Sequence, residues 1–164
     1  MRTVVATLSE LPLRWQLFLR TYRWRTINPV PWTPLLKPLS ECRAALVTSA
    51  GFSLPDQEPF DESVRGGDFS FRVIPRGTDP SVLVSSQRSE LFDHRGMLED
   101  PNLAFPLDRL RELVARGRLG SLATANLSFM GSITAPGRLV QQTAPEGAAI
   151  LVQDQVDIAL LVPV

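Results

Sequence analysis

The stretch Val156-Asp157-Ile158-Ala159-Leu160-Leu161-Val162-Pro163-Val164 decides the fold that this sequence predicts. It is an apolar run of strand length, rich in β-branched residues, with one acidic residue near its start. Such runs are typical of strands that are buried on both faces of a parallel α/β sheet. We therefore expect a fully buried strand. The carboxyl end of such a strand is where α/β folds place ligands and reactive groups.

Strand and helix patterns alternate along the chain before this run. Apolar stretches predict strands over residues 43–48, 69–75 and 121–129, and helical patterns cover residues 106–117 and 138–153. This alternation is typical of a parallel sheet with right-handed crossovers. We expect a single-domain α/β fold with three layers, Rossmann-like or flavodoxin-like, whose mostly parallel sheet is incomplete at the C-terminus.

Both expected helices carry boundary signals. Pro106 and Asp108 suit the first turn of one helix, and Gly117 suits the position just past its end. Its predicted buried stripe consists of Leu107, Leu110, Leu113 and Val114. In the second helix, over residues 138–153, Pro145 predicts a kink or a break. Its predicted inward residues are Leu139, Ala148, Ile150, Leu151 and Val152.

Within the single expected domain of residues 1–164, we assign residues 39–164 to the sheet core. Residues 1–38 form an N-terminal amphipathic helix and a proline-rich wrap. Ser9 suits the cap of that helix and Pro12 its first turn. Its expected aromatic and apolar face consists of Leu11, Trp15, Phe18 and Tyr22. This helix either docks on its own domain or, as a basic amphipathic helix, binds a partner or a membrane surface.

Composition excludes several classes of function. The chain has 17 basic and 17 acidic residues, so its net charge is zero and gives no reason to expect nucleic acid as a partner. The single Cys42 cannot form an internal disulfide, and no Cys or His cluster predicts a metal site. No run approaches the roughly 18 apolar residues of a membrane span, and no signal peptide is evident. We expect a cytoplasmic protein with no metal, cofactor or membrane partner.

No complete catalytic set assembles from the residues alone. Cys42 and His94 form a Cys-His pair in principle, but Cys42 precedes its strand and therefore suits a structural role better. An adjacent acid can orient His94, although sequence neighbours rarely point to the same place. The residues at expected strand ends and in nearby loops form a candidate pocket, and each of them could equally be scaffold. They are Ser49, Gly51, Asp93, His94, Ser128 and Gly131.

Several ordered motifs carry a family resemblance from about Leu11 onward. They are Pro38-Leu39-Ser40-Glu41, Ala44-Ala45-Leu46-Val47-Thr48, Phe71-Arg72-Val73-Ile74-Pro75, residues 100–113, Ser128-Phe129-Met130-Gly131, Thr143-Ala144-Pro145-Glu146 and residues 156–164. With them the chain resembles the selenoprotein B family of glycine, sarcosine, betaine and D-proline reductases, in particular its short single-domain members.

The resemblance implies a redox motif directly after the strand that matches residues 156–164. That motif is a selenocysteine or cysteine, two residues, and a cysteine. We therefore expect the catalytic residue just after Val164, and a chain cut there because a UGA codon was read as a stop. The family implies a reductase with an amino-acid-like substrate and a dithiol electron donor. The chain alone would then be an inactive scaffold, and its uncovered apolar surface would favour a homo-oligomer. The alternative is a non-catalytic α/β protein that binds a small ligand or a partner.

Overall fold

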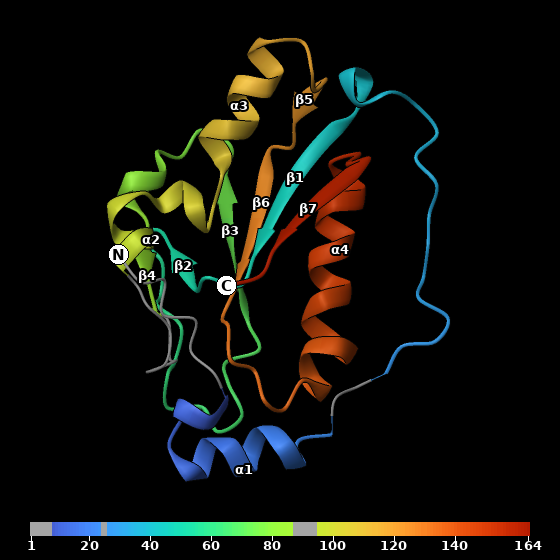
Figure 1. The fold of residues 1–164 in the computed structure, drawn as a ribbon. Helices are drawn as coiled ribbons and strands as arrows, with labels where there is room; N and C mark the ends of the chain where they lie inside the picture. The colour runs from blue at the N-terminus through green and yellow to red at the C-terminus, as the bar shows by residue number, and fades with distance from the viewer. Residues whose placement is uncertain (1–7, 24–25, 87–94) are drawn as a thin grey trace. The chain divides into compact units, whose positions relative to one another are not determined.

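The computed structural model describes residues 8–23, 26–86 and 95–164 (Figure 1). The described chain divides into two compact units, one that ends at Pro34 and one that spans Leu35–Val164. The expected division at residues 38 and 39 stays a prediction.

The first unit contains a short 3-10 turn, η1 (Leu8–Glu10), and a helix, α1 (Leu13–Thr21). Pro12, rather than Ser9, is the residue before the first helical position, so the predicted Ser9 cap is wrong. The reason is local: Ser9 lies inside η1. The aromatic face is confirmed, because the ring centroids of Trp15 and Phe18 are 5.9 Å apart and those of Phe18 and Tyr22 are 5.3 Å apart.

The second unit is built on a mostly parallel sheet, as predicted. Its strands are β1 (Arg43–Thr48), β3 (Phe71–Pro75), β5 (Ser121–Leu122), β6 (Ala125–Phe129) and β7 (Ile158–Val162). β1 pairs in parallel with β5, β6 and β7, and β3 runs antiparallel beside β6. A separate small sheet pairs β2 (Phe52–Ser53) with β4 (Val84–Ser85).

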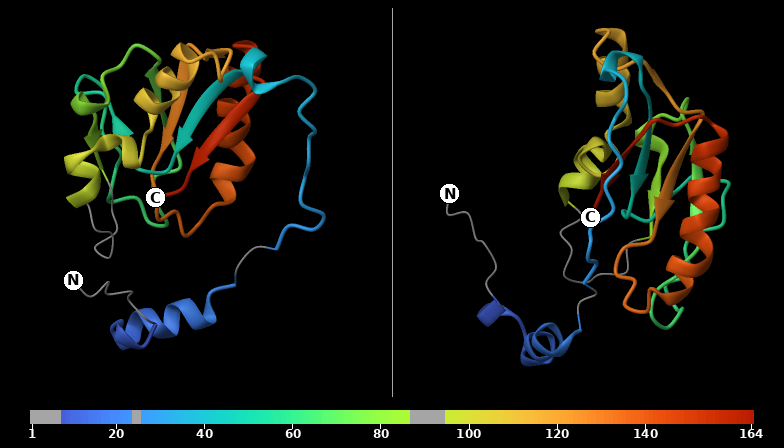
Figure 2. Two further views of the ribbon diagram at one scale, coloured as in Figure 1. Left: turned by 45° about the horizontal axis from the view of Figure 1, so that its top comes forward. Right: turned by 90° about the vertical axis from the view of Figure 1, so that its right-hand side faces the viewer.

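Helices cover both faces of the sheet, which gives the expected three layers (Figure 2). α2 (Arg95–Glu99) and α3 (Leu107–Ala115) lie on one face. On the other face, a π-helical turn, η5 (Leu139–Thr143), leads directly into α4 (Ala144–Gln153). Pro145 lies in the first turn of α4, so the predicted irregularity at this proline is a π-helical turn immediately before it.

Three further 3-10 turns complete the connections. They are η2 (Leu39–Glu41), η3 (Pro80–Val82) and η4 (Pro101–Leu103). η2 leads into the amino end of β1, where Cys42 is fully buried and its sulfur lies 3.3 Å from the carbonyl oxygen of Pro38. This position supports a structural role for Cys42, because ligand sites of α/β sheets lie at the opposite, carboxyl end.

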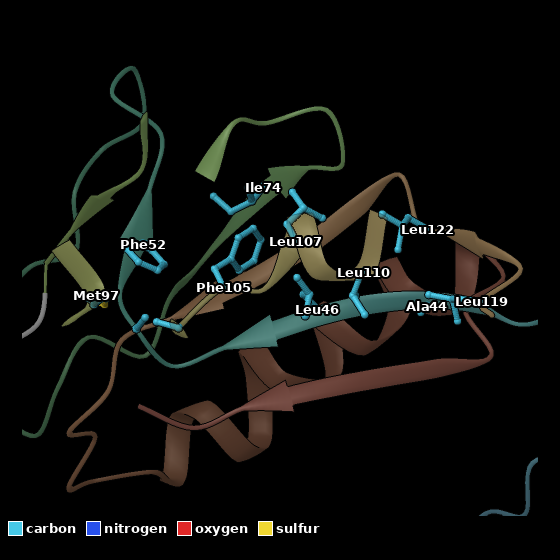
Figure 3. Packing of buried hydrophobic residues seen from close by; sticks show 12 residues of the cluster. Ala44, Leu46, Phe52, Ile74, Met97, Phe105, Leu107, Leu110, Leu119 and Leu122 are labelled. Atoms are coloured by element: carbon cyan, nitrogen blue, oxygen red, sulfur yellow. The ribbon is translucent and has the colours of Figure 1, made fainter. Parts of the chain in front are cut away.

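The hydrophobic core lies between the sheet and the α2–α3 face (Figure 3). Leu46 of β1, Ile74 of β3 and Leu107 of α3 are fully buried in it. Phe105 fills its centre, and its ring centroid lies 6.3 Å from that of Phe52 in an edge-to-face contact. Burial of such side chains supplies most of the driving force that holds α3 on the sheet.

A bulge separates β5 from β6, where a single strand was predicted. The side-chain oxygen of Asn126 accepts a hydrogen bond from the backbone nitrogen of Leu46 at 2.8 Å, and its amide donates to the carbonyl oxygen of Ile74 at 3.3 Å. Asn126 is fully buried, so both of these bonds replace hydrogen bonds to water. The side chain thus substitutes for backbone pairing where the extra residues interrupt the ladder.

Asp154, the residue that follows α4, anchors this bulge. Its carboxylate accepts hydrogen bonds from the backbone nitrogen of Thr124, from the Thr124 hydroxyl at 2.9 Å and from Arg43 at 3.1 Å. Burial acts to raise the pKa of Asp154, but the hydrogen bonds from Thr124 and Ala125 and the Arg43 charge outweigh it, so the pKa is lowered. Asp154 therefore links α4, β1 and the bulge as an ionised group.

The structure corrects three burial predictions. β7 is not fully buried: within the described chain it pairs only with β1, and Leu160 and Leu161 are 43% and 67% exposed. An apolar pattern is compatible with burial, but only neighbouring elements can supply it. In α4, Ala148 and Val152 are exposed rather than inward, and in α3 Leu113 is 41% exposed.

Candidate functional site

The carboxyl ends of β1, β6 and β7 surround a cavity of about 680 Å³, which we call the carboxyl-edge cavity. Its wall consists of Val47–Ser49, Phe129–Ile133, Leu161–Val164, Leu139 and Ala144. The strands contribute their last residues and the segments that follow, while Leu139 and Ala144 come from the η5–α4 helix. The cavity therefore occupies the place where α/β sheets bind ligands.

Ser49 joins β1 to the end of β7 at the rim of this cavity. Its hydroxyl oxygen accepts a hydrogen bond from the backbone nitrogen of Val164 at 2.9 Å and donates to the carbonyl oxygen of Val164 at 3.3 Å. The backbone nitrogen of Ser49 donates to the carbonyl oxygen of Val162 at 3.2 Å. These bonds hold the chain after β7 against the turn after β1.

The turn after β1 is stabilised by Thr48 and Gly51. The Thr48 hydroxyl donates to the carbonyl oxygen of Ala104 at 2.7 Å and accepts from the backbone nitrogen of Ala50 at 3.1 Å. Gly51 has a φ of +65°, a conformation that favours glycine, and its nitrogen donates to the carbonyl oxygen of Phe129 at 2.9 Å. Gly51 is therefore a turn residue beside the cavity and not part of its wall.

Ser128 precedes Phe129 of the cavity wall in β6 and does not line the cavity itself. It is fully buried in β6, where it faces Thr48 in the parallel ladder with β1. Its hydroxyl oxygen has no hydrogen-bond partner among the described residues. A buried hydroxyl without a partner is unfavourable, so this position has an energetic cost that the surrounding core must offset.

The six predicted pocket residues thus differ in their positions relative to the cavity. Ser49 and Gly131 line the cavity, and Gly51 and Ser128 lie next to it. Asp93 and His94 lie outside the described residues. Whether any of the six acts in a site stays a prediction.

Sequence reasoning missed most of the cavity wall. The rule that pointed to Ser49 and Gly131 could also have pointed to Thr48 and Met130, because they lie at the same strand ends. Leu139 and Ala144 carried no such signal, since the position of their helix over the sheet decides whether they reach the cavity.

Charged groups gather at the opposite, amino end of β7. Asp157 accepts a hydrogen bond from the backbone nitrogen of Arg43 at 2.7 Å, and its carboxylate lies 2.8 Å from the Lys37 ammonium. Two hydrogen bonds lower the pKa of Asp157: the one from the backbone of Arg43 has the larger effect and the one from Lys37 the next largest. No charged side chain of the described chain lines the carboxyl-edge cavity itself.

Another cavity, of about 870 Å³, lies against α3 and includes charged residues. Arg111 in its wall is already engaged: its guanidinium bonds the Asp108 carboxylate at 2.6 Å and the carbonyl oxygen of Thr78 at 2.7 Å. The contact with Thr78 attaches α3 to the loop after β3, and the contact with Asp108 lies within α3. Among the described residues, no group of three His, Cys, Asp or Glu side chains could hold a metal ion.

The protein is of the α/β class and has an apolar cavity at the carboxyl edge of its mostly parallel sheet. Residues 11–163 match the model of the glycine/sarcosine/betaine reductase selenoprotein B family. The chain belongs to this family, and the resemblance found in its motifs is confirmed.

Two curated relatives are reductase subunits. The chain is 36% identical over 136 residues to the D-proline reductase subunit gamma of Acetoanaerobium sticklandii. This aligned region covers 82% of the chain and 54% of the relative. It is also 29% identical over 116 residues to the sarcosine reductase complex component B subunit beta of Peptoclostridium acidaminophilum. That aligned region covers 71% of the chain and 27% of the relative. The chain thus matches about half of the first relative and about a quarter of the second. No solved structure matches it significantly.

In the part of the chain that the structure describes, no helix has both the length and the apolar character that a membrane span requires.

Proposed function

We propose that this chain is the scaffold of a selenol- or thiol-dependent reductase whose reactive group belongs directly after Val164. The observation that carries the proposal is the position of Val164, which Ser49 holds at the rim of the carboxyl-edge cavity. A residue attached there would lie beside a cavity of ligand size. Family membership supports the reaction class.

The proposed chemistry needs an anionic nucleophile. A selenol or thiol in the first turn of a following helix would gain from the helix dipole, which favours its ionised form. The selenolate would attack a carbon atom of an amino-acid-like substrate and break its bond to the leaving group, such as an amine, so that a selenium–carbon bond forms. A cysteine three residues further on would then attack selenium and form a selenosulfide, and the released carbon fragment would take up a proton as the reduced product. A dithiol donor would return both electrons and become a disulfide.

The 164-residue chain is inactive in this proposal. Its only cysteine, Cys42, is buried at the amino end of β1, far along the strand from the cavity at the carboxyl end. We place the protein in the cytoplasm, because a reducing compartment suits selenol chemistry and a free thiol.

The nucleotide sequence after the Val164 codon tests this proposal. We expect UGA, followed in frame by two codons and a cysteine codon. UAA or UAG without such a cysteine would refute it. If the codon is UGA, the extended protein with cysteine in that position should accelerate the reduction of a disulfide test substrate above the rate with dithiothreitol alone, whereas its serine counterpart should not.

A second candidate function is a non-catalytic protein that binds a small ligand or a partner. The observation in its favour is that the chain builds its own core, with Leu46 and Phe105 fully buried. Cooperative thermal unfolding of a monomer would support it. Under the first proposal, the exposed Leu160, which does not line the carboxyl-edge cavity, instead makes the isolated chain dimerise or aggregate, which sedimentation velocity would detect.

A further inference from the structure

The geometry points to the carboxyl-edge cavity as a binding site for an uncharged, apolar molecule. This inference deepens the proposed function, because the cavity lies beside the position assigned to the reactive group. Binding itself does not depend on that group. An amino-acid-like substrate would therefore place only its apolar part in this cavity and keep its ionised groups outside.

The size of the cavity suits a small molecule. Its volume of about 680 Å³ lies within the range of roughly 300 to 1,000 Å³ that is usual for ligand sites. Leu139, Ile133 and Leu161 reach it from different segments of the chain. Residues so far apart in sequence form one apolar wall, which offers contact on several sides.

Two of the three polar side chains in the wall, those of Thr48 and Ser49, are already engaged in hydrogen bonds. The Thr48 hydroxyl bonds Ala104 and Ala50, and the Ser49 hydroxyl bonds Val164. A ligand therefore gains more from apolar contact than from new hydrogen bonds to these groups.

No described charged side chain lines the cavity to receive an ionised ligand group. Arg138 lies next to Leu139 in sequence, but its guanidinium stacks 4.1 Å from the centroid of the Phe69 ring instead. A carboxylate or sulfonate placed against this apolar wall gives up part of its hydration and finds no charged side chain as a partner. This loss weakens binding by at least about tenfold relative to a neutral molecule of the same shape.

A pair of fluorescent probes tests this inference on the 164-residue protein with an amidated C-terminus, so that no terminal carboxylate at Val164 repels the anionic probe. N-phenyl-1-naphthylamine is neutral, and 8-anilino-1-naphthalenesulfonate has nearly the same shape with one negative charge. Fluorescence titration at pH 7 should show that the neutral probe binds at least about tenfold more tightly. Equal affinity for both probes, or no binding of the neutral probe, would overturn the inference.

Two variants of α4 distinguish binding of the probe in the cavity from its binding to other exposed apolar surface. Ala144 lines the cavity and Ala148 does not, while both are exposed on the same helix. Ala144→Phe should fill the cavity and lower the affinity for the neutral probe at least about fivefold. Ala148→Phe should change that affinity less than twofold. An equal response of the two variants would show that the probe binds general apolar surface, and would overturn the inference.

Competition and gene sequence complete the test. Naphthalene in excess should displace the neutral probe, whereas naphthalene-2-sulfonate at the same concentration should not; equal displacement by both would contradict the requirement for an uncharged ligand. If Ala144→Phe changed the oligomeric state in sedimentation velocity, the cavity would be a protein contact and the inference would fail. A UAA or UAG codon after Val164 would refute the reactive group but would leave probe binding unchanged.

Discussion

The hydroxyl of Ser49 accepts a hydrogen bond from the backbone nitrogen of Val164 at 2.9 Å, across 115 residues of sequence. This contact fixes the end of β7 beside the carboxyl-edge cavity. The hydrogen bond from Val164 to Ser49 therefore determines the position of any residue that follows Val164.

Ser49→Ala should loosen the chain end after β7 without unfolding the sheet. A hydrogen bond of this kind contributes about 1 kcal/mol, so the amide of Val164 should exchange with deuterium roughly fivefold faster. Amide exchange measured by nuclear magnetic resonance tests this. Ser40→Ala, which changes an exposed serine in η2 at the other end of β1, is the control and should leave Val164 unaffected. Equal exchange in wild type and Ser49→Ala would contradict the role of Ser49.

Asp154→Asn should destabilise the second unit by about 1 to 2 kcal/mol, because the bonds from Thr124 and Arg43 lose their charge assistance. Urea unfolding followed by circular dichroism measures the change. Glu146→Gln alters an exposed carboxylate in the first turn of the same helix and should cost no more than about 0.5 kcal/mol. Similar losses in both variants would mean that Asp154 acts only through general charge.

Stability should fall in acid because the pKa values of Asp154 and Asp157 are lowered in the folded chain, for the reasons given above. An unfolded aspartate has a pKa of about 3.9 and thus binds protons before the folded one does. The stabilisation is therefore fully present above about pH 4 and is lost as the pH falls through the folded pKa values. Urea unfolding from pH 7 to pH 2.5 should show this loss.

In the same pH series, Asp154→Asn should lose less stability than wild type, because one of the linked groups is gone. The two curves should converge at the acid end. Parallel curves would indicate that Asp154 contributes nothing to the acid response.

Gly120→Ala should destabilise the junction between η2 and β5 by about 1 to 3 kcal/mol. A Cβ at this position would lie 2.7 Å from the carbonyl carbon of Glu41 and 2.8 Å from the carbonyl oxygen of Cys42, and backbone atoms cannot move aside cheaply. Gly137→Ala is the control, because a Cβ there meets nothing within 4 Å. Thermal unfolding should leave Gly137→Ala near the wild-type midpoint. A midpoint for Gly120→Ala as high as that of Gly137→Ala would refute the close approach.

Local patterns predicted the regular elements well. The strand expected over residues 43–48 is β1 to the residue, and Gly117, with a φ of +66°, follows α3 as expected. Each of these signals lies within a few residues of the structure that it predicts. The break between β5 and β6 had no such signal, because it depends on the bonds of Asn126 to Leu46 and Ile74, 80 and 52 residues away.

The candidate site was predictable only where it follows strand ends. Ser49 and Gly131 were found in this way, and both line the cavity. Leu139 and Ala144 were not found, because a helix position shows which residues share a face but not which part of the sheet that face covers. That no charged side chain of the described residues lines the cavity is likewise a property of the assembled wall.

The sequence by itself determined the α/β class, the family and the apolar character of the stretch from Val156 to Val164. Only the tertiary structure decided that β7 pairs with β1 alone within the described chain, with Leu161 67% exposed. It also decided that Ser49 binds Val164 at the cavity. The physical reason is that side-chain hydrophobicity is encoded residue by residue, whereas burial and long-range hydrogen bonds depend on which distant segments pack together.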